Sequence, residues 1–501
     1  MTNSKLTNIL LWCCMFFLIS CYNGRSNKKL NANSPVQAAR ILSDQKWMED
    51  FEQLYRLLKT THRDLYHKTN KEQFEQLFLE IKNIIPKLTD HEIIVQFARF
   101  VALVNDGHTR LTLPLQEGLG LGQAHSKTPY PSNDRLLFRV LPVEFYWFDD
   151  GLYIIKASKL HENLIGKKVL SINDTPIEEA LESARQLAHF DNESGYKLIA
   201  PSRLSILETL QGLKIAKNDA DGVVLTIQNG ETKERIAIEA LDRFTQERLS
   251  GTSLSTKKQE DTYYSYEYLA GRNALYVKIN RMNDAPTGPT LVQFLGKIDE
   301  MIKKKRVERL VLDLRNNFGG NNINTVPIVN LINKNSHLNK IGSFYTLIGR
   351  KTFSAAQNLV NDLSTWTNVV FVGEPTGASP SHYGDSKKTQ LSNSNLTVRI
   401  SSIYWRDASP DEKKEWTRPD IAVENNATDY FQNKDAALNV CLEFKTAPNW
   451  LDTYYRLCVS GGMNTAERLY TRFPLDWQHT QADFKALETM MVQRIFNKDP
   501  Q

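Results

Sequence analysis

A serine at an expected strand-to-helix junction is the first candidate for chemistry. Ser354 follows the stretch 343–349, which predicts a strand, and precedes Ala355, where a helix should begin. A nucleophilic oxygen placed there would gain from the positive end of the helix dipole, and the N–H of Ala355 would point at a developing oxyanion. A serine at a helix start is more often a cap for the helix, so its position alone does not establish catalysis.

A glycine turn supplies the second candidate element. Residues 309–314 are mostly aliphatic and predict a strand buried on both faces, and Gly319 and Gly320 follow it. Glycine lets backbone N–H groups come close to a ligand, and open α/β sheets place their sites at the carboxyl ends of strands. The turn could therefore form half of an oxyanion hole. We read Asp313 and Arg315 as structural, pairing beneath the turn.

Two histidines compete for the role of general base, since a neutral imidazole accepts a proton near neutral pH. His108 follows Asn105-Asp106-Gly107, a run that favours a helix C-terminal cap and turn. His382 lies closer to Ser354 in sequence, in a loop rich in proline, serine and glycine, where an exposed histidine needs no explanation. A lone histidine after a helix is usually a capping or surface residue, so the residues alone leave both candidates open.

Helices before residue 112 must carry His108. Apolar residues at spacings of three and four mark two helices, and the capping-box pair Thr89 and Glu92 starts a third. We therefore expect an N-terminal helical domain over 36–112. The following glycine-rich run, Gly118 to Gly122, lacks the flanking strand and helix of a dinucleotide site and predicts a loop.

Three further segments differ in pattern. Residues 136–240 predict a β-rich module, with strands over 136–147 and 152–157, a segment from Gly166 to Asp174 that loosely resembles part of a PDZ domain, and a helix over 177–187. This resemblance implies peptide binding by strand addition. Over 262–427, strands and helices alternate, which predicts a mostly parallel sheet with helices on both faces. Residues 428–501 predict an amphipathic helical tail.

The N-terminus carries a targeting signal. Lys5 precedes an unbroken apolar run from Ile9 to Ile19, long enough for a signal-peptide core and short for a membrane-spanning helix. The run ends in Leu18-Ile19-Ser20-Cys21, which resembles the lipobox of bacterial lipoproteins; a bare anchor helix is the alternative. We predict a signal peptide over 1–20, lipidation of Cys21 and a polar tether over 21–35, which would hold the protein in the cell envelope, with the outer membrane favoured.

Composition and cysteine usage exclude other functions. The 62 Lys+Arg and 57 Asp+Glu give a net charge of +5, and no basic stripe interleaved with aromatics is visible, so nucleic acid is not an expected partner. No metal-ligand spacing is visible, and we expect neither a metal nor an organic cofactor. Cys441 and Cys458 would remain in the mature chain, either paired or as free buried thiols.

Four short motifs in a fixed order resemble the tail-specific (C-terminal processing) and tricorn-type serine peptidases. They are the segment 313–320, Thr352-Phe353-Ser354-Ala355-Ala356, Val372-Gly373-Glu374-Pro375-Thr376-Gly377 and Arg418-Pro419-Asp420-Ile421. The likeness reaches back to Asp106-Gly107-His108-Thr109 and covers roughly residues 40–430. It implies a multidomain α/β protein with a helical bundle, a degenerate PDZ-like module and a ClpP/crotonase-like catalytic core.

The resemblance also implies a nucleophile and an oxyanion hole. Ser354 would attack, and the N–H groups of Gly319 or Gly320 and of Ala355 would bind the oxyanion. The processing branch takes its base from a lysine shortly after the Gly-Glu-x-Thr segment, where this chain has Ser379. A Ser-Lys dyad is therefore not expected.

The tricorn-like branch instead implies His108 as the base. Its acid lies shortly before the Pro-Asp-Ile motif, where Asp411, Glu412 and Glu415 qualify, and we favour Glu412 as the group that orients His108. The expected function is thus a serine peptidase of the bacterial envelope that hydrolyses peptide or protein substrates through an acyl-enzyme. The alternative is a non-catalytic envelope lipoprotein that binds peptides or small apolar ligands on the same scaffold, since fold does not fix function.

Overall fold

The computed structural model describes residues 40–115, 131–241, 249–251, 262–406 and 414–444. The predicted signal peptide with Cys21, the loop Gly118 to Gly122, the acids Asp411 and Glu412, and Cys458 lie outside these ranges. Within them, no helix has both the length and the apolar character needed to cross a membrane.

The N-terminal part is helical, as the apolar spacing predicts. It contains α1 (Asp44–Thr61), α2 (Lys71–Ile84) and α3 (Asp90–Ala102). The side chain of Thr89 accepts from Glu92 N while the Glu92 side chain accepts from Thr89 N, which confirms the capping box at the start of α3. The apolar faces of the three helices share one core that includes Trp47, Phe51, Phe74, Phe97 and Phe100.

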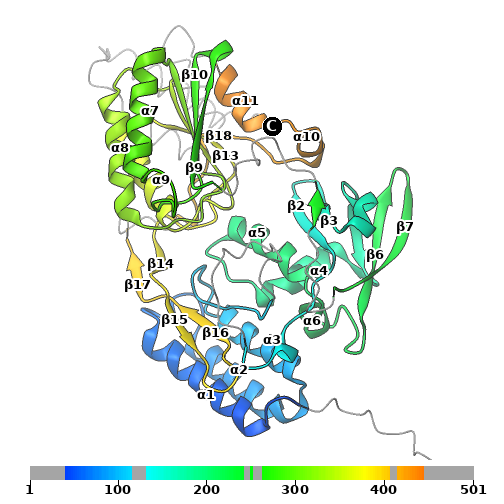
Figure 1. Ribbon diagram of the computed structural model, residues 1–501. Coiled ribbons are helices and arrows are strands. Elements are labelled where there is room, and N and C mark those ends of the chain that lie inside the picture. Colours follow the sequence, from blue (N-terminus) through cyan, green and yellow to red (C-terminus); the bar gives the residue numbers. More distant parts are fainter. Residues whose placement is uncertain (1–39, 116–130, 242–248, 252–261, 407–413, 445–501) are drawn as a thin grey trace, which may run out of the picture. The chain divides into compact units, whose positions relative to one another are not determined.

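A three-stranded antiparallel sheet joins this helical part to residues almost three hundred positions later. Its order is β1 (Arg110–Leu111), β16 (Thr397–Ile400) and β15 (Lys387–Gln390). Leu111 and Val398 pack into the same core as the helices. Figure 1 shows β15 and β16 beside the N-terminal helices, an arrangement that no local sequence pattern indicates.

The β-rich segment forms a second sheet, with β2 (Val143–Phe148), β3 (Gly151–Ala157), β4 (Lys168–Ile172), β6 (Gly222–Asn229) and β7 (Thr232–Glu239) in that order. Two short strands, β5 (Thr175–Pro176) and β8 (Ser250–Gly251), pair with β4 and β3. The helices α4 (Ile177–Ala184), α5 (Glu193–Leu204) and α6 (Leu207–Gly212) contribute to the same core.

One strand prediction was wrong at its start. The sequence predicts a strand from Leu136, but Leu136 ends a short 3-10 turn and β2 begins at Val143. Leu136 and Phe138 are apolar because they fill the core of the N-terminal helices, whereas Val143 belongs to the core of the sheet. The largely apolar stretch 136–147 therefore contributes to two cores in succession.

The third sheet confirms the predicted α/β core. Its order is β18 (Ile421–Ala422), β13 (Val370–Gly373), β12 (Phe344–Ile348), β11 (Arg309–Asp313), β10 (Ala274–Ile279) and β9 (Tyr264–Leu269). All neighbours pair in parallel except β9 and β10. Strand β11 is central and its apolar side chains are buried, as its sequence predicts.

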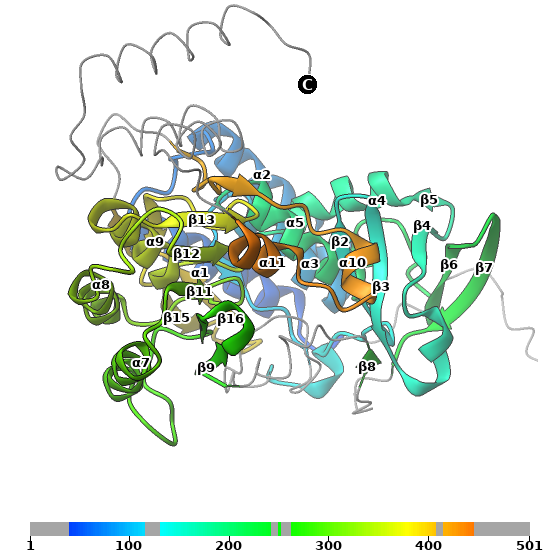
Figure 2. The same ribbon diagram turned by 90° about the horizontal axis from the view of Figure 1, so that it is seen from above.

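Helices cover both faces of this sheet. On one face lie α7 (Leu291–Lys305), α8 (Thr325–Lys334) and α9 (Ala355–Trp366), and on the other lies α11 (Ala436–Glu443), which follows the short α10 (Ala427–Phe431) (Figures 1 and 2). Cys441 of α11 is buried against the sheet. The predicted tail is thus helical as far as the structure describes it.

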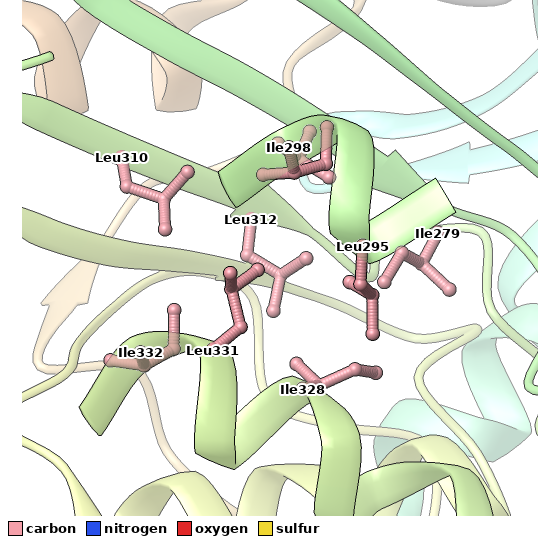
Figure 3. Close-up of a pocket in the computed structure, with 9 residues that line it drawn as sticks. Ile279, Leu295, Ile298, Leu310, Leu312, Ile328, Leu331 and Ile332 are labelled. Atoms are coloured by element: carbon pink, nitrogen blue, oxygen red, sulfur yellow. The ribbon is translucent and has the colours of Figure 1, made fainter. Parts of the chain in front are cut away.

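A small apolar gap remains between this sheet and its helices (Figure 3). Its volume is about 10 Å³, and it is lined by aliphatic side chains of β10, β11, α7 and α8, among them Ile279, Leu312 and Ile328. A gap of this size is at the lower limit for one water molecule. It contains no residue to which the sequence assigns a role, so it is a packing feature of the core.

Candidate active site

Ser354 occupies a strained backbone position at the start of α9. Its φ of 56° and ψ of −127° lie in a region that non-glycine residues rarely adopt, and its side chain makes no capping hydrogen bond to the helix. The helix-cap interpretation therefore does not account for the serine. A serine held at a sharp strand-to-helix turn with its hydroxyl not used for capping is the arrangement expected of a nucleophile.

The glycine turn packs directly against this serine. A Cβ added to Gly319, whose φ is 98°, would lie 2.7 Å from the Cβ of Ser354 and 2.8 Å from the N of Ala355. Only glycine fits so close a contact. The backbone of the turn and the first residue of α9 thus lie against the serine, where an oxyanion hole would have to form.

Asn317 fixes the turn, and sequence reasoning assigned it no role. The buried side-chain amide of Asn317 accepts from Gly319 N through its oxygen at 2.8 Å and donates to Ile279 O through its nitrogen at 2.9 Å. The backbone carbonyl of Asn317 accepts from Phe353 N at 3.1 Å. The N–H of Gly319 is therefore engaged. Its position one residue after Asn316 in a turn was the available signal, since asparagine side chains commonly bond to nearby backbone.

Beneath the turn, the predicted pair of Asp313 and Arg315 is confirmed and extended. Arg315 lies 2.7 Å from Asp313 and 2.7 Å from Asp435, which precedes α11, and Tyr276 donates to Asp313. Burial alone would lower the pKa of Arg315, but the two carboxylates raise it well above its usual value. The network keeps its charges and connects α11 to the base of the glycine turn.

His108 stacks on the residue that precedes the serine. Its ring centroid lies 4.4 Å from that of Phe353, and the ring of His382 is nearly parallel to it at 5.6 Å. The structure therefore brings the predicted histidine turn and the predicted serine junction together. Within the described residues, the Nδ1 atom of His108 is buried and has no hydrogen-bond partner.

The surroundings of His108 keep its imidazole neutral. Burial, followed by the charge of His382, lowers the pKa of His108 to about 3, while Asp106 and the backbone of Tyr383 act in the opposite direction. A neutral ring can accept a proton, but so low a pKa makes a weak base. A carboxylate beside the unpartnered Nδ1 would raise the pKa and fix the ring.

Asp106 holds the histidine turn in place. Its carboxylate accepts from the backbone N of His108 at 2.6 Å and of Thr109 at 2.8 Å, from the hydroxyl of Ser401 at 3.0 Å, and from Nε2 of His62 at 2.8 Å. Burial alone would raise the pKa of Asp106, but the hydrogen bonds from His62 and Thr109 lower it well below its usual value. The carboxylate is thus ionised and fully engaged.

The expectation that His382 is exposed was wrong. It lies in β14 (His382–Gly384), which pairs with β17 (Ile403–Trp405), and only 3% of its surface is exposed. Its Nδ1 donates to Ser379 O at 3.0 Å. His382 therefore stacks against the ring of His108, and this position depends on pairing with a strand about 20 residues later, for which the sequence carries no local signal.

Of the three predicted acids, Glu415 lies within the described residues. Glu412, the favoured acid, and Asp411 lie outside the described residues. The side chain of Glu415 is exposed, and its backbone carbonyl accepts from Asn192 at 2.8 Å and from the Ser379 hydroxyl at 2.6 Å. The roles assigned to the site residues stay predictions.

One segment of the chain matches the model of a known protein family. The model of peptidase family S41 matches residues 273–341, which include β10, β11 and the glycine turn. No curated protein matches the chain in sequence.

Solved structures extend the similarity beyond this segment. Mature CPAF is 13% identical, with 80% of this chain and 97% of that chain covered and a TM-score of 0.54. Mature CPAF complexed with lactacystin gives 13% identity, 78% and 96% coverage and a TM-score of 0.53. The photosystem II D1 C-terminal processing protease, at 13% identity and 84% and 99% coverage, has a TM-score of 0.35, too low to add to the argument. At these identities the CPAF structures establish a shared fold.

Proposed function

We propose that the chain is a serine peptidase of family S41, the tail-specific peptidases, and that it cleaves peptide bonds through an acyl-enzyme formed on Ser354; the family-model match over residues 273–341 and the fold shared with CPAF support this. The observation that carries this proposal is the strained backbone of Ser354, packed against Gly319, with the ring of His108 stacked on Phe353 next to it. A serine peptidase acts on peptides or proteins, so its substrate belongs to that class.

In the proposed reaction, His108 accepts the proton of Ser354 as the hydroxyl attacks the scissile carbonyl. The N–H groups of Ala355 and of the glycine turn bind the oxyanion; because Asn317 already accepts from Gly319, Gly320 is the turn donor we favour. His108 then donates the proton to the leaving amine, and water hydrolyses the acyl-enzyme by the same route.

We propose Glu412 as the acid that orients His108. The supporting observation is the buried Nδ1 of His108, which has no partner among the residues that the structure describes. An acid there would stabilise the imidazolium that forms during attack. Replacing Glu412 by glutamine should lower kcat strongly with little change in KM, whereas the same change at Glu415, whose side chain is exposed, should have little effect.

A serine-directed fluorophosphonate tests the nucleophile. The wild-type chain should be labelled, and Ser354→Ala should lose both labelling and peptide hydrolysis. Equal labelling of Ser354→Ala would refute the assignment and would favour the alternative of a non-catalytic binder on this scaffold. Loss of activity in His382→Ala with retention in His108→Ala would move the base to His382.

We further propose that the protein is a lipoprotein of the cell envelope, anchored through Cys21. The support is the apolar run that ends in Leu18-Ile19-Ser20-Cys21 and the polar residues that follow it. In bacterial cells, the wild-type chain should incorporate labelled fatty acid and sediment with membranes, and Cys21→Ser should do neither. Membrane association of Cys21→Ser would favour an uncleaved anchor helix.

A further inference from the structure

Three cationic side chains form a row across the sheet of β1, β16 and β15. Arg110 lies opposite Arg399, and Arg399 lies opposite Lys388 in the next antiparallel pair. Residues directly opposite in antiparallel strands share a face, so the three side chains stand side by side. We call Arg110, Arg399 and Lys388 the cationic row. Arg110 is far in sequence from Lys388 and Arg399, so the complete row exists only in the folded chain.

The row occupies the polar face of this sheet. The alternate positions Leu111 and Val398 point into the core of the N-terminal helices, which places the row on the opposite face. Thr397 shares the face of Arg399, and its hydroxyl is buried without a partner among the described residues. The face thus offers the positive charge of the row.

The positive charge of the row is not neutralised by the described part of the chain. None of the three side chains forms an ion pair there, and the carboxylate of Asp106 already binds His62 and the histidine turn. Adjacent like charges on one sheet face are destabilising unless an anion offsets them.

A third arginine, which is buried, adds to this charge. Arg203 of α5 is 4% exposed, and its Nε donates to Leu187 O at 2.9 Å. Burial, followed by repulsion from Arg399, lowers the pKa of Arg110 to about 10, and burial followed by repulsion from Arg110 lowers the pKa of Arg203 to about 10. Both groups would be stabilised by an anion nearby.

The row leads from solvent to the candidate active site. Lys388 is exposed, Arg399 and Arg110 are half-buried, and Arg110 comes two residues after His108. At the same end, Ser401, two residues beyond Arg399, donates to Asp106. An anionic group bound along the row would therefore lie beside the histidine turn.

We propose that the cationic row binds carboxylates of an acidic segment of the peptide substrate and so directs the peptidase to acidic sequences. Neighbouring strands are spaced about 5 Å apart, and alternate side chains of an extended peptide about 7 Å, so carboxylates two residues apart can reach different members of the row. The proposal rests on the proposed function for its substrate class, but the binding itself requires no catalysis.

Binding can be measured separately from chemistry with the Ser354→Ala chain. The probes are a fluorescent peptide that carries several aspartates and the same peptide with asparagines, compared by fluorescence anisotropy. We expect the aspartate peptide to bind at least tenfold more tightly, and this preference should weaken as salt is added. In the Ser354→Ala background, Arg399→Gln should remove most of the preference and Lys388→Gln a smaller part, because Lys388 is exposed.

Lys387→Gln is the matched control. Lys387 is exposed and adjacent to Lys388, but it lies opposite Ile400 and therefore points to the other face. Its loss should leave the preference unchanged. The proposal would be overturned if Lys387→Gln and Arg399→Gln lost the preference equally. It would also be overturned if the Ser354→Ala chain with the row unchanged bound the two peptides equally. Stronger competition by a single-stranded oligonucleotide than by the aspartate peptide would also overturn it, in favour of a general polyanion surface.

The same variants with Ser354 intact separate this proposal from the proposed function. If Arg399→Gln retains fluorophosphonate labelling and cleaves the asparagine peptide normally but cleaves the aspartate peptide about tenfold less efficiently, both proposals are supported. If neither the wild-type chain nor any variant is labelled but the binding preference holds, the cationic row is supported and the assignment of Ser354 as the nucleophile is wrong.

Discussion

The two halves of the candidate site are held in different ways. The serine half, formed by Ser354, Gly319 and Asn317, depends on backbone conformation, with positive φ at two adjacent turns and a contact that only glycine permits. The histidine half, formed by His108 and Asp106 with His62, depends on buried side chains that contact one another across the sequence. One half is built from chain geometry and the other from a polar network.

This difference predicts different sensitivities. In the serine half, an added methyl group should displace the reacting atoms without unfolding the sheet, because the strain is local. In the histidine half, loss of one oxygen should weaken the fold itself, because a buried ionised group holds several elements together.

Among changes that leave the Ser354 hydroxyl in place, Gly319→Ala should have the largest effect on activity. Its Cβ would lie 2.7 Å from the Cβ of Ser354, and its φ of 98° disfavours alanine, so the serine and the turn must move apart. We expect kcat/KM to fall by about 10²-fold or more, while the thermal unfolding temperature changes modestly. Gly271→Ala is the control, since an added Cβ there has no atom within 4 Å. Normal activity in Gly319→Ala would show that the turn is not part of the site.

Asp106→Asn should have the largest effect on stability. The change leaves Asp106's partners, His62 and the turn N–H groups, without a charged acceptor, and we expect a loss of about 3 kcal/mol in the free energy of unfolding at pH 7. Urea denaturation would measure it. Asp219→Asn, at an exposed residue without an ion pair in the described structure, should change stability by less than about 0.5 kcal/mol.

The pH dependence of this difference provides a second check. Because the pKa of Asp106 is lowered in the folded protein, its stabilisation is fully present above the unfolded pKa of 3.8 and declines as pH falls below it. The gap between wild type and Asp106→Asn should therefore be constant from pH 7 to about 5 and narrow toward pH 3. A gap that widens on acidification would contradict an ionised, hydrogen-bonded carboxylate.

The sequence predicted the serine half better than the histidine half, and the physical reason is locality. Ser354, the glycine turn and the strands around them are marked by consecutive residues, so composition and spacing reveal them. The partners of Asp106 are not: Ser401 and His62 lie at opposite ends of the chain. His382 was predicted to be exposed because its loop composition is polar, yet strand pairing buries it.

The same limit applies to the support beneath the site. Asp313 and Arg315 are two residues apart and their pairing was predictable, whereas Asp435 reaches Arg315 from 120 positions later. Apolar periodicity fixes the helices and strands, but polar contacts of buried side chains depend on how those elements pack.

His382→Phe should have a moderate effect that appears mainly in the pH profile. Phenylalanine keeps an aromatic wall beside His108 but removes the charge that, after burial, contributes most to lowering the pKa of His108. The acidic limb of kcat/KM should therefore move to higher pH, while activity at pH 8 stays within about tenfold of wild type. The other charged groups that face His108, Asp106 and Arg110, are unchanged. Activity lost at every pH would identify His382 as the base and overturn its role as a wall.

A comparison of two helix starts gives the smallest expected effect on stability. It measures the capping energy that α9 lacks because the Ser354 hydroxyl makes no capping bond. The Thr89 hydroxyl caps α3 by accepting from Glu92 N at 3.3 Å and also donates to the Glu92 carboxylate at 2.9 Å, so Thr89→Ala should cost about 1 kcal/mol of stability with little change in activity. Ser354 stands at the same position of α9 and makes no capping bond, so Ser354→Ala should change stability by less than about 0.5 kcal/mol although it abolishes hydrolysis. Urea denaturation of both variants would decide. A loss of about 1 kcal/mol in Ser354→Ala would mean that its hydroxyl caps α9 in solution, and a hydroxyl used for capping is not free to attack a substrate.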